Sequence, residues 1–280
     1  RVLNLRFIES VVIDEADRMF DMGFVDDIHF LFRKMPPRDQ RQSMLFSATL
    51  DQRVMRLSAR YMKETSKIEI EPDKLVVDSI EQELFHVGSH EKMNLLLGLL
   101  KRETPHRSVI FVNTKRAGEE IAWRLTKNGH PAVYMSGDLP QKKRLSIINA
   151  YKEGKIQTLV ATDVASRGLH VDDVSHVFNY DLPEDPEDYV HRIGRTARAG
   201  ASGKAIAFAC ELFVYSLEAT EQLIGSSIPV GFPDDELFLE DKAGFYKYMP
   251  GKPFIGWPQE RTGGGGAPRN RGRQRRKTSS

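Results

Sequence analysis

The sequence predicts an α/β fold in which mainly parallel sheets are covered by helices. Over residues 81–228, short apolar runs of strand length alternate with segments of helical periodicity, which is typical of such sheets. Polar and charged residues follow directly after several of these runs. Ligands of parallel sheets bind at the carboxyl ends of the strands, so we expect a functional site there.

Residues 1–72 are interpreted as the C-terminal part of a first α/β domain, because strand-like runs and helix-like segments alternate in it. Pro36 and Pro37 end its first helix, and Pro72 interrupts the pattern before a linker over residues 73–80. The predicted strands are Phe7–Ile13, Ser43–Phe46 and one near Ile68–Ile70, and the predicted helices are Asp26–Lys34 and Gln52–Met62.

Residues 81–228 are predicted to form a complete second domain. The segment Lys115–Asn128 places its apolar residues on one helical face and stops at Gly129, and Gln141–Lys152 has the same character. The predicted strands are Gln82–Val87, Ser108–Val112, Ala132–Met135, Thr158–Ala161, His176–Tyr180 and Lys204–Ala209.

Residues 229–280 form an extension of different character. Residues 229–260 are rich in Pro, Gly and aromatic residues without clear periodicity, whereas residues 261–280 contain seven Arg or Lys and no Asp or Glu. The second of these segments cannot bury enough apolar surface to fold, so we expect a disordered basic tail.

Composition excludes several classes of protein. The 280 residues are 40% hydrophobic, enough to build real cores, but the longest apolar runs are far too short to cross a bilayer. The single cysteine, Cys210, lies in an apolar run, which rules out a disulfide framework and predicts a buried core residue. No signal-peptide pattern occurs at the start, and we expect a cytoplasmic protein that does not bind membranes.

The most informative stretch is Val11–Ile13, three β-branched residues that lead directly into Asp14, Glu15 and Asp17. A strand that ends in paired carboxylates can deliver one group to hydrated Mg²⁺ and a second to the attacking water in nucleotide hydrolysis. The alternative is a strand end followed by a solvated acidic turn without a ligand.

Two further motifs favour the first interpretation. Ser47 and Thr49 follow the short apolar segment Met44–Phe46, and an arginine-rich stretch runs from His191 to Arg198. These three motifs in this order resemble the DEAD-box family of ATP-dependent RNA helicases over residues 1–228. The resemblance implies RecA-like parallel-sheet domains, here the end of lobe 1 and a complete lobe 2, with ATP and Mg²⁺ as cofactors and RNA as a partner.

In lobe 1, the resemblance implies catalytic roles for the acidic motif. Asp14 and Glu15 would hold Mg²⁺ through water, and Glu15 would also polarise the attacking water. Asp17 would connect the motif to Ser47 and Thr49, which couple the two lobes. The alternative for these two hydroxyl residues is ordinary capping of the following helix.

The arginine-rich stretch is the catalytic counterpart in lobe 2. If residues 187–198 are helical, His191, Arg195 and Arg198 are spaced i, i+4 and i+7 and share one face. The two guanidinium groups would match the charge on a transferring phosphoryl group, and His191 would link to the acidic motif. The alternative is that these arginines form surface ion pairs with neighbouring carboxylates.

Ala197 departs from the family, which commonly has glycine between the two arginines. Alanine favours a helix by up to about 1 kcal/mol over glycine, so the predicted helix should persist. The sequence leaves open whether the added methyl group crowds the phosphates.

Lobe 2 also carries the residues that the resemblance assigns to RNA. Thr114, Gln141, Arg144 and Thr162 would contact backbone phosphates, and such contacts carry no base specificity. For Gln141 and Arg144 the alternative is a solvated helix start. The positive charge of residues 261–280 predicts further RNA contacts without sequence preference.

Residues just after Thr162 would serve the lobe interface and the nucleotide. Asp163 and Arg167 would order the interface between the lobes. His170 stands where many members of the family hold the ATP ribose with aspartate, and histidine is a weaker, pH-dependent partner there. The alternative for His170 is a loop residue without a ligand.

The sequence lacks a G-x-x-x-x-G-K-[ST] phosphate loop and begins at Arg1, shortly before the acidic motif. We therefore expect the C-terminal part of a longer helicase that unwinds short RNA duplexes and is inactive without its upstream half. Phe208–Glu211 and residues 224–230 are similar to bacterial members that act in the RNA degradosome, which implies RNA decay and a ribonuclease scaffold as partner. The alternatives are a non-catalytic RNA-binding or scaffold-docking module and a DNA-directed helicase.

Overall fold

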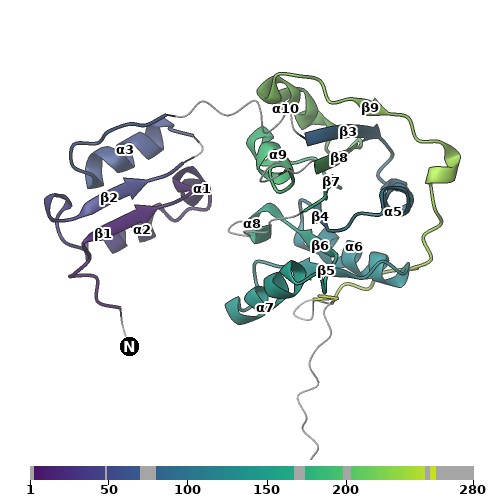
Figure 1. Ribbon diagram of the computed structural model, residues 1–280, viewed down its shortest axis with the longest axis horizontal. Helices are drawn as coiled ribbons and strands as arrows, with labels where there is room; N and C mark the ends of the chain where they lie inside the picture. The colour runs from purple at the N-terminus through teal and green to yellow at the C-terminus, as the bar shows by residue number, and fades with distance from the viewer. Residues whose placement is uncertain are drawn as a thin grey trace, which may run out of the picture. The chain divides into compact units, whose positions relative to one another are not determined.

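The computed structural model describes residues 3–47, 49–69, 80–166, 174–197, 203–249 and 253–256. The chain divides into two compact units, Arg1–Glu71 and Pro72–Ser280, and each is described by itself (Figure 1). Within the described ranges, no helix has both the length and the apolar character that a membrane span requires.

The first unit is a two-stranded parallel sheet, β1 and β2, with helices α1, α2 and α3 packed around it. Its elements are β1 (Ser10–Ile13), α1 (Ala16–Asp21), α2 (Val25–Phe32), the short 3₁₀ helix η1 (Arg38–Gln40), β2 (Gln42–Leu45) and α3 (Gln52–Tyr61). α3 begins at a well-defined cap, because the Asp51 side chain accepts a hydrogen bond from Val54 N–H at 2.8 Å. Val54 and Leu57 then face the small core.

The strands predicted in the first unit have different outcomes. β1 and β2 lie within the ranges expected for the first two, apart from the first residue of β2. The strand predicted near Ile68–Ile70 is wrong over the described Ile68 and Glu69, which have no regular secondary structure. A strand needs a neighbour for its backbone hydrogen bonds, and the described sheet of this unit pairs only β1 with β2.

The second unit contains a seven-stranded sheet in the order β5-β6-β4-β7-β8-β3-β9, and its strand pairs are parallel. Strands and helices alternate along the chain, as predicted. The elements are β3 (Ile80–His86), α5 (Lys92–Glu103), β4 (Ser108–Phe111), α6 (Lys115–Lys127), β5 (Ala132–Met135), α7 (Gln141–Lys152), β6 (Thr158–Ala161), α8 (Asp163–Ser166), β7 (His176–Asn179), α9 (Pro186–Ile193), β8 (Gly203–Ala209), η3 (Val214–Ser216), α10 (Leu217–Ile224), β9 (Val230–Gly231) and η4 (Asp235–Leu237).

Helices cover both faces of this sheet (Figure 1). Successive strand residues point to opposite faces, so Ile110 of β4 packs with α5 and α6, whereas Val109 and Phe111 pack with α7. β4, β5 and β6 are buried at every position, as expected of strands in a parallel sheet with two covered faces. Cys210 is free and 3% exposed, which confirms that it is a core residue.

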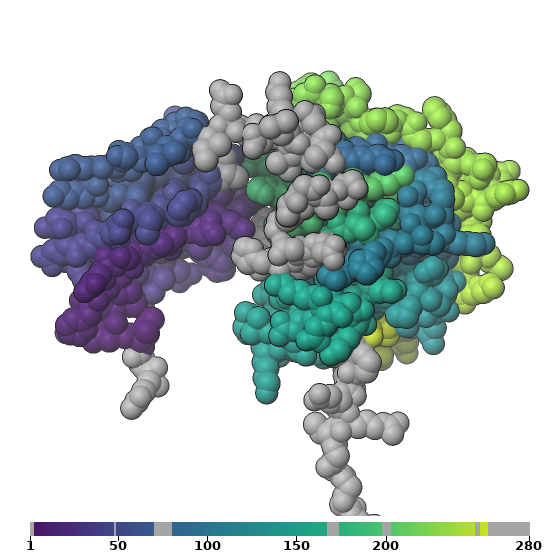
Figure 2. Space-filling view, viewed as in Figure 1, coloured from purple at the N-terminus to yellow at the C-terminus, as the bar shows by residue number. Residues whose placement is uncertain are grey.

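The C-terminal extension belongs to the second unit over its described residues. β9 pairs with β3 at one edge of the sheet. Further along, Asp241 forms an ion pair with Arg124 of α6 at 2.5 Å, and Ile255 O accepts a hydrogen bond from Tyr134 N–H of the opposite edge strand at 2.8 Å. In Figure 2 the yellow-green extension runs along the blue and teal residues of this unit. Residues 261–280, the predicted basic tail, lie outside the described residues.

Candidate functional site

The acidic motif occupies the turn between β1 and α1. Asp14 and Glu15 are exposed, and the Glu15 N–H donates to Asp14 Oδ1 at 2.9 Å. Glu15 has φ 50° and ψ 49°, a left-handed conformation that costs a residue with a Cβ about 1 kcal/mol or more. Strained backbone of this kind clusters at functional sites. The turn leaves both carboxylates in solvent at the carboxyl end of β1.

Asp17 is 4% exposed and joins this motif to the segment after β2. Thr49 donates to Asp17 Oδ2 through its N–H at 3.0 Å and its hydroxyl at 3.2 Å, and the Asp17 N–H donates to Ser47 Oγ at 3.1 Å. Burial opposes ionisation, but hydrogen bonds from the backbones of Arg18 and Thr49 and from the two hydroxyls hold the pKa of Asp17 below its usual value. Asp51 caps α3, so the two hydroxyl residues are not needed as its caps.

The carboxylates of the first unit fit a hydrated Mg²⁺ rather than a metal cage built from protein. Among the described residues, no group of three or more His, Cys, Asp or Glu is placed to hold a metal ion. Mg²⁺ keeps several waters and needs only one or two carboxylates beside phosphate oxygens. Asp14 and Glu15 are exposed oxygen donors of this kind, whereas hydrogen bonds already occupy Asp17.

The residues that the resemblance assigns to RNA lie after β4, β5 and β6, on the carboxyl side of the second sheet. Thr114 is exposed, and its Oγ1 accepts a hydrogen bond from the first turn of α6 at 3.1 Å. Gln141 is exposed at the start of α7, and Arg144 Nη2 donates to Ala165 O at 3.1 Å. Thr162 is only 9% exposed. Arg144 therefore connects α7 to α8, which begins directly after Thr162.

α9 is shorter than the helix predicted over residues 187–198, and that prediction is wrong beyond Ile193. Gly194 ends the helix, and Thr196 forms a β-bridge with Val174, which draws the chain out of helical geometry. His191 is half-buried in the last turn, whereas Arg195 lies in the turn that follows. The two side chains therefore do not share a helical face.

Ala197 is not helical either, so the argument from helix propensity was wrong. Its φ is 55°, in the left-handed region that favours glycine. Its methyl group packs against the cluster that contains Tyr189 and Ile193 of α9. The glycine common in the family therefore suits the backbone at this position, and alanine adopts the same conformation at a cost of about 1–2 kcal/mol.

Arg192 is a residue that the sequence analysis missed. It is 1% exposed, and its Nε and Nη2 donate to the two carboxylate oxygens of Asp163 at 2.7 Å each. Asp163, predicted to order the lobe interface, is thus held within its own unit. The spacing of Arg192 with the buried Tyr189 and Ile193 could have indicated that it faces inward.

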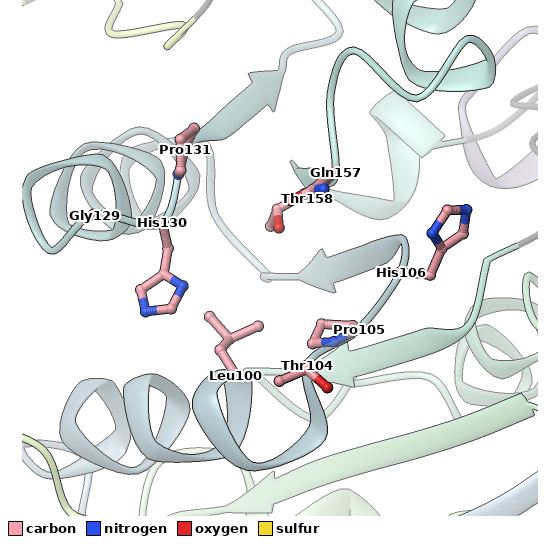
Figure 3. A pocket seen from close by; sticks show the side chains of 9 residues that line it. All are labelled: Leu100, Thr104, Pro105, His106, Gly129, His130, Pro131, Gln157 and Thr158. Atoms are coloured by element: carbon pink, nitrogen blue, oxygen red, sulfur yellow. The ribbon is translucent and has the colours of Figure 1, made fainter.

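Three predicted residues lie outside the described residues: Arg167, His170 and Arg198. A hollow in the second unit is also separate from the residues discussed so far. Figure 3 shows it near the C-terminal end of α5, between His106 and the segment of His130 and Pro131. Its lining residues lie mostly just before β4, β5 and β6, whereas the candidate site residues follow strands.

Comparison with known proteins agrees with the arrangement of these motifs. Residues 1–57 match the family described as DEAD/DEAH box helicase, and residues 91–200 match the helicase conserved C-terminal domain. The chain is 50% identical over 275 residues to the ATP-dependent RNA helicase RhlB of Escherichia coli O1:K1, covering 97% of this chain and 63% of that protein. It spans between 55% and 63% of the length of the curated relatives it matches.

Solved structures give the same result. A variant of Dbp5 from S. cerevisiae, bound to RNA and ADP–BeF₃, superposes with a TM-score of 0.74 at 31% identity, covering 84% of this chain and 62% of that chain. The E. coli DEAD-box protein SrmB, bound to regulator of ribonuclease activity A, gives a TM-score of 0.54 at 38% identity, covering 60% of this chain and 98% of that chain. From its motifs, its fold and these matches, the chain belongs to the DEAD-box family of RNA helicases.

Proposed function

We propose that this chain, joined to an upstream segment like that of its relatives, is an ATP-dependent RNA helicase that separates short RNA duplexes. The observation that carries the proposal is the different environments of the three carboxylates in the acidic motif. Asp14 and Glu15 are exposed at the end of β1, whereas Thr49 holds Asp17. Two carboxylates are thereby left for hydrated Mg²⁺ and for the water that attacks the γ-phosphate.

Each residue has a specific part in this reaction. Asp14 would hold Mg²⁺ through water, and the metal would supply charge neutralisation for the phosphates. Glu15 orients the attacking water and accepts its proton. Arg195 and Arg198 stabilise the charge on the transferring phosphoryl group, and His191 links the arginine-rich stretch to the acidic motif.

RNA is held through its backbone by Thr114, Gln141, Arg144 and Thr162, with the basic tail as a further, sequence-independent anchor. Release of the products after hydrolysis lets the RNA dissociate. The 50% sequence identity to RhlB supports RNA decay as the process and a ribonuclease scaffold as the partner. So does the resemblance of Phe208–Glu211 and residues 224–230 to bacterial degradosome helicases.

A hybrid protein tests the proposal. In it, the upstream part of the E. coli relative precedes Arg1 of this chain. We expect the hybrid to release phosphate from ATP faster when RNA is present, and the 280-residue chain alone to release none. Glu15→Gln should abolish turnover in the hybrid while RNA and ATP still bind, because an amide cannot accept the proton of the water.

Glu9→Gln is the matched control, because Glu9 is also exposed but immediately precedes β1, at its opposite end. It should leave turnover unchanged. A hybrid that binds RNA and ATP but does not hydrolyse ATP would instead indicate the non-catalytic RNA-binding or scaffold-docking module. Phosphate release by the 280-residue chain alone, at a rate typical of helicases, would contradict the proposed division of the ATP site.

A further inference from the structure

The C-terminal extension is fixed to α6 by polar contacts. Asp241 Oδ2 accepts a hydrogen bond from Arg124 Nε at 2.6 Å, and Asp241 Oδ1 accepts one from Asn128 Nδ2 at 2.5 Å. Asn128 also binds the backbone of the extension, because its Oδ1 accepts from Lys242 N–H at 2.9 Å. These contacts hold the start of the segment 241–249 at the C-terminal end of α6.

Tyr246 fixes the middle of the same segment. Its hydroxyl donates to Glu119 Oε2 at 3.1 Å, and its ring lies against that of Trp123, with the two centroids 5.3 Å apart. Glu119 is only 6% exposed, so this hydrogen bond is buried at the carboxylate end. The segment 241–249 has no regular secondary structure, but its two anchors give it a defined path along α6.

The side chains next to Tyr246 are exposed to solvent. Phe245 is 90% exposed, and Tyr248 and Met249 are 41% and 51% exposed. Lys247 lies between them and is exposed as well. Large apolar side chains that gather in solvent on an anchored segment indicate an interaction surface.

Positive charge surrounds the aromatic rings of this region. The Arg116 guanidinium lies 5.9 Å from the centroid of the Tyr248 ring, and Lys127 Nζ lies 6.0 Å from that of Trp123. Within the part of the chain that the structure describes, no carboxylate forms an ion pair with Arg116, Lys127 or Lys247. We call this set the basic aromatic surface: Arg116, Trp123, Lys127, Phe245, Lys247 and Tyr248.

Carboxylates along this side of α6 are already paired with other cations. Arg124 forms ion pairs with Asp241 at 2.5 Å and with Glu120 at 3.8 Å, and Lys115 forms one with Asp138 at 2.6 Å. The uncompensated charge of the basic aromatic surface is therefore positive. Cations beside exposed rings suit a single-stranded nucleic acid, because its bases stack on the rings and its phosphates pair with the cations.

The basic aromatic surface continues the predicted RNA path. Thr114 caps α6, since its Oγ1 accepts a hydrogen bond from Ala117 N–H at 3.1 Å, and Arg116 lies in the first turn of the same helix. Tyr248 lies beside Arg116, so the extension reaches the end of α6 that carries Thr114. An RNA strand whose backbone is held at Thr114 can continue over Arg116 to the exposed rings.

We propose that the basic aromatic surface is a second contact region for single-stranded RNA, an inference that rests on the RNA-binding part of the proposed function. Bases stack on Phe245 and Tyr248, and phosphates pair with Arg116 and Lys247. Such stacking tolerates any sequence, because every base has a flat π face. The surface thus lengthens the bound strand without adding base specificity, and it is separate from the basic tail over residues 261–280.

Binding of labelled oligouridine to the 280-residue chain, followed by fluorescence anisotropy, tests the proposal. Phe245→Ala should weaken binding by about 5- to 150-fold, the effect of losing one base–aromatic stack. Phe232→Ala is the matched control, because Phe232 is 91% exposed in the same extension but directly follows β9, at the edge of the sheet. It should leave the affinity unchanged. Every variant keeps residues 261–280, so the contribution of the tail is the same in all of them.

The salt dependence of the same binding tests the phosphate contacts. Lys247→Ala should reduce the slope of log K against log salt by about 0.7, the contribution of one phosphate contact on a single strand. Lys101→Ala is the control, because Lys101 is exposed in the last turn of α5 and is not part of the basic aromatic surface. An unchanged slope in Lys247→Ala would contradict the proposal.

Ultraviolet crosslinking to oligouridine locates the contact directly. Crosslinked peptides should contain Phe245 or Tyr248, and none should contain Phe232. Equal affinities of Phe245→Ala and Phe232→Ala would overturn the proposal, and weaker binding of a polyglutamate peptide by Phe245→Ala would then assign the surface to an acidic protein. Failure of the unsubstituted chain to bind oligouridine at all would contradict the RNA contacts of the proposed function instead.

Discussion

The two units use the same α/β architecture but enclose their sheets to different degrees. In the second unit, β4, β5 and β6 are buried at every position. In the first unit, Val12 of β1 is 54% exposed, and Phe46 and Phe30 are 56% and 53% exposed. The acidic motif thus lies on the less enclosed sheet, where the hydrogen bonds of Asp17 and the packing of the buried Ala16 fix its geometry.

This difference indicates how the candidate residues of each unit are positioned. Arg192 in the second unit is held by a buried network inside a large core, so its neighbours are preorganised. In the first unit, the position of the acidic motif depends more on the left-handed backbone of Glu15 and on the two hydrogen bonds that Thr49 donates to Asp17.

The largest expected effect is a difference in local stability within the intact chain. Amides of β4 should exchange only through unfolding that costs on the order of 5–15 kcal/mol, as in ordinary domains. Amides of β1 should exchange through openings whose free energy is at least about 3 kcal/mol below that of β4, because the sheet of the first unit buries less apolar surface. Native-state hydrogen exchange measures both. Equal protection of β1 and β4 would contradict the inferred difference in local stability between the two sheets.

Asp17→Asn should destabilise the first unit at pH 7 by about 1.5–3 kcal/mol, because the amide removes the negative charge and replaces one of the two acceptor oxygens by a donor. The folded-state pKa of Asp17 is lowered, so its ionisation stabilises the unit above the unfolded pKa of about 3.9. That contribution is lost as the pH falls through the folded pKa. Denaturant unfolding at pH 7, 5 and 3 should therefore show the difference between the two proteins shrinking only below about pH 4.

Gly98→Ala should destabilise the second unit by about 1–3 kcal/mol or more, although alanine is the better helix former. A Cβ at Gly98 of α5 would come within 1.7 Å of Leu237 O in the extension, a backbone atom that cannot easily move aside. Gly137→Ala is the control, because its Cβ would meet only a Val164 methyl group at 3.7 Å. Thermal unfolding compares them, and equal melting temperatures would show that the extension packs loosely.

The smallest expected effect is a gain of about 1 kcal/mol from Ala197→Gly, because glycine adopts a positive φ without strain. Ala219→Gly is the control, since Ala219 is exposed within α10 and glycine should cost about 1 kcal/mol there. Opposite signs in denaturant unfolding are the expected result. A loss of stability in both variants would show that Ala197 is not strained.

Sequence patterns predicted some elements to the residue. β5, β6 and α7 have the predicted bounds, because in each the hydrophobic pattern is clear and residues on both sides interrupt it. The end of α9 was missed, because it depends on the tertiary bridge between Val174 and Thr196. Such a bridge leaves no signal in local propensity.

α5 and the C-terminal extension were harder to predict, and the reason is the same for both segments. α5 is buried on nearly all sides, including Met93 and Gly98, so it lacks the polar face that marks a surface helix. Its outer side is covered by η4 and by Leu239, whose N–H donates to Asn94 O at 3.1 Å. Neither segment has a recognisable periodicity without the other.

Within the candidate site, the motifs on strand ends were predictable and the buried network was not. The contact of Asp17 with Ser47 and Thr49 follows from a family resemblance. The contacts of Arg192 depend on which segments meet in space, and neither Asp163 nor Asn113 is near it in sequence. The catalytic roles of the candidate residues stay predictions.

The most direct test of the central claim is a double-mutant cycle on kcat in the hybrid protein. If Glu15 in the first unit and Arg195 in the second act on one phosphoryl transfer, Glu15→Gln and Arg195→Ala should each lower kcat by about 10³-fold or more. The double variant should then be no slower than the slower single variant, since residues that act as a unit are strongly non-additive. Multiplying effects, or near-full kcat in Arg195→Ala, would contradict a shared ATP site.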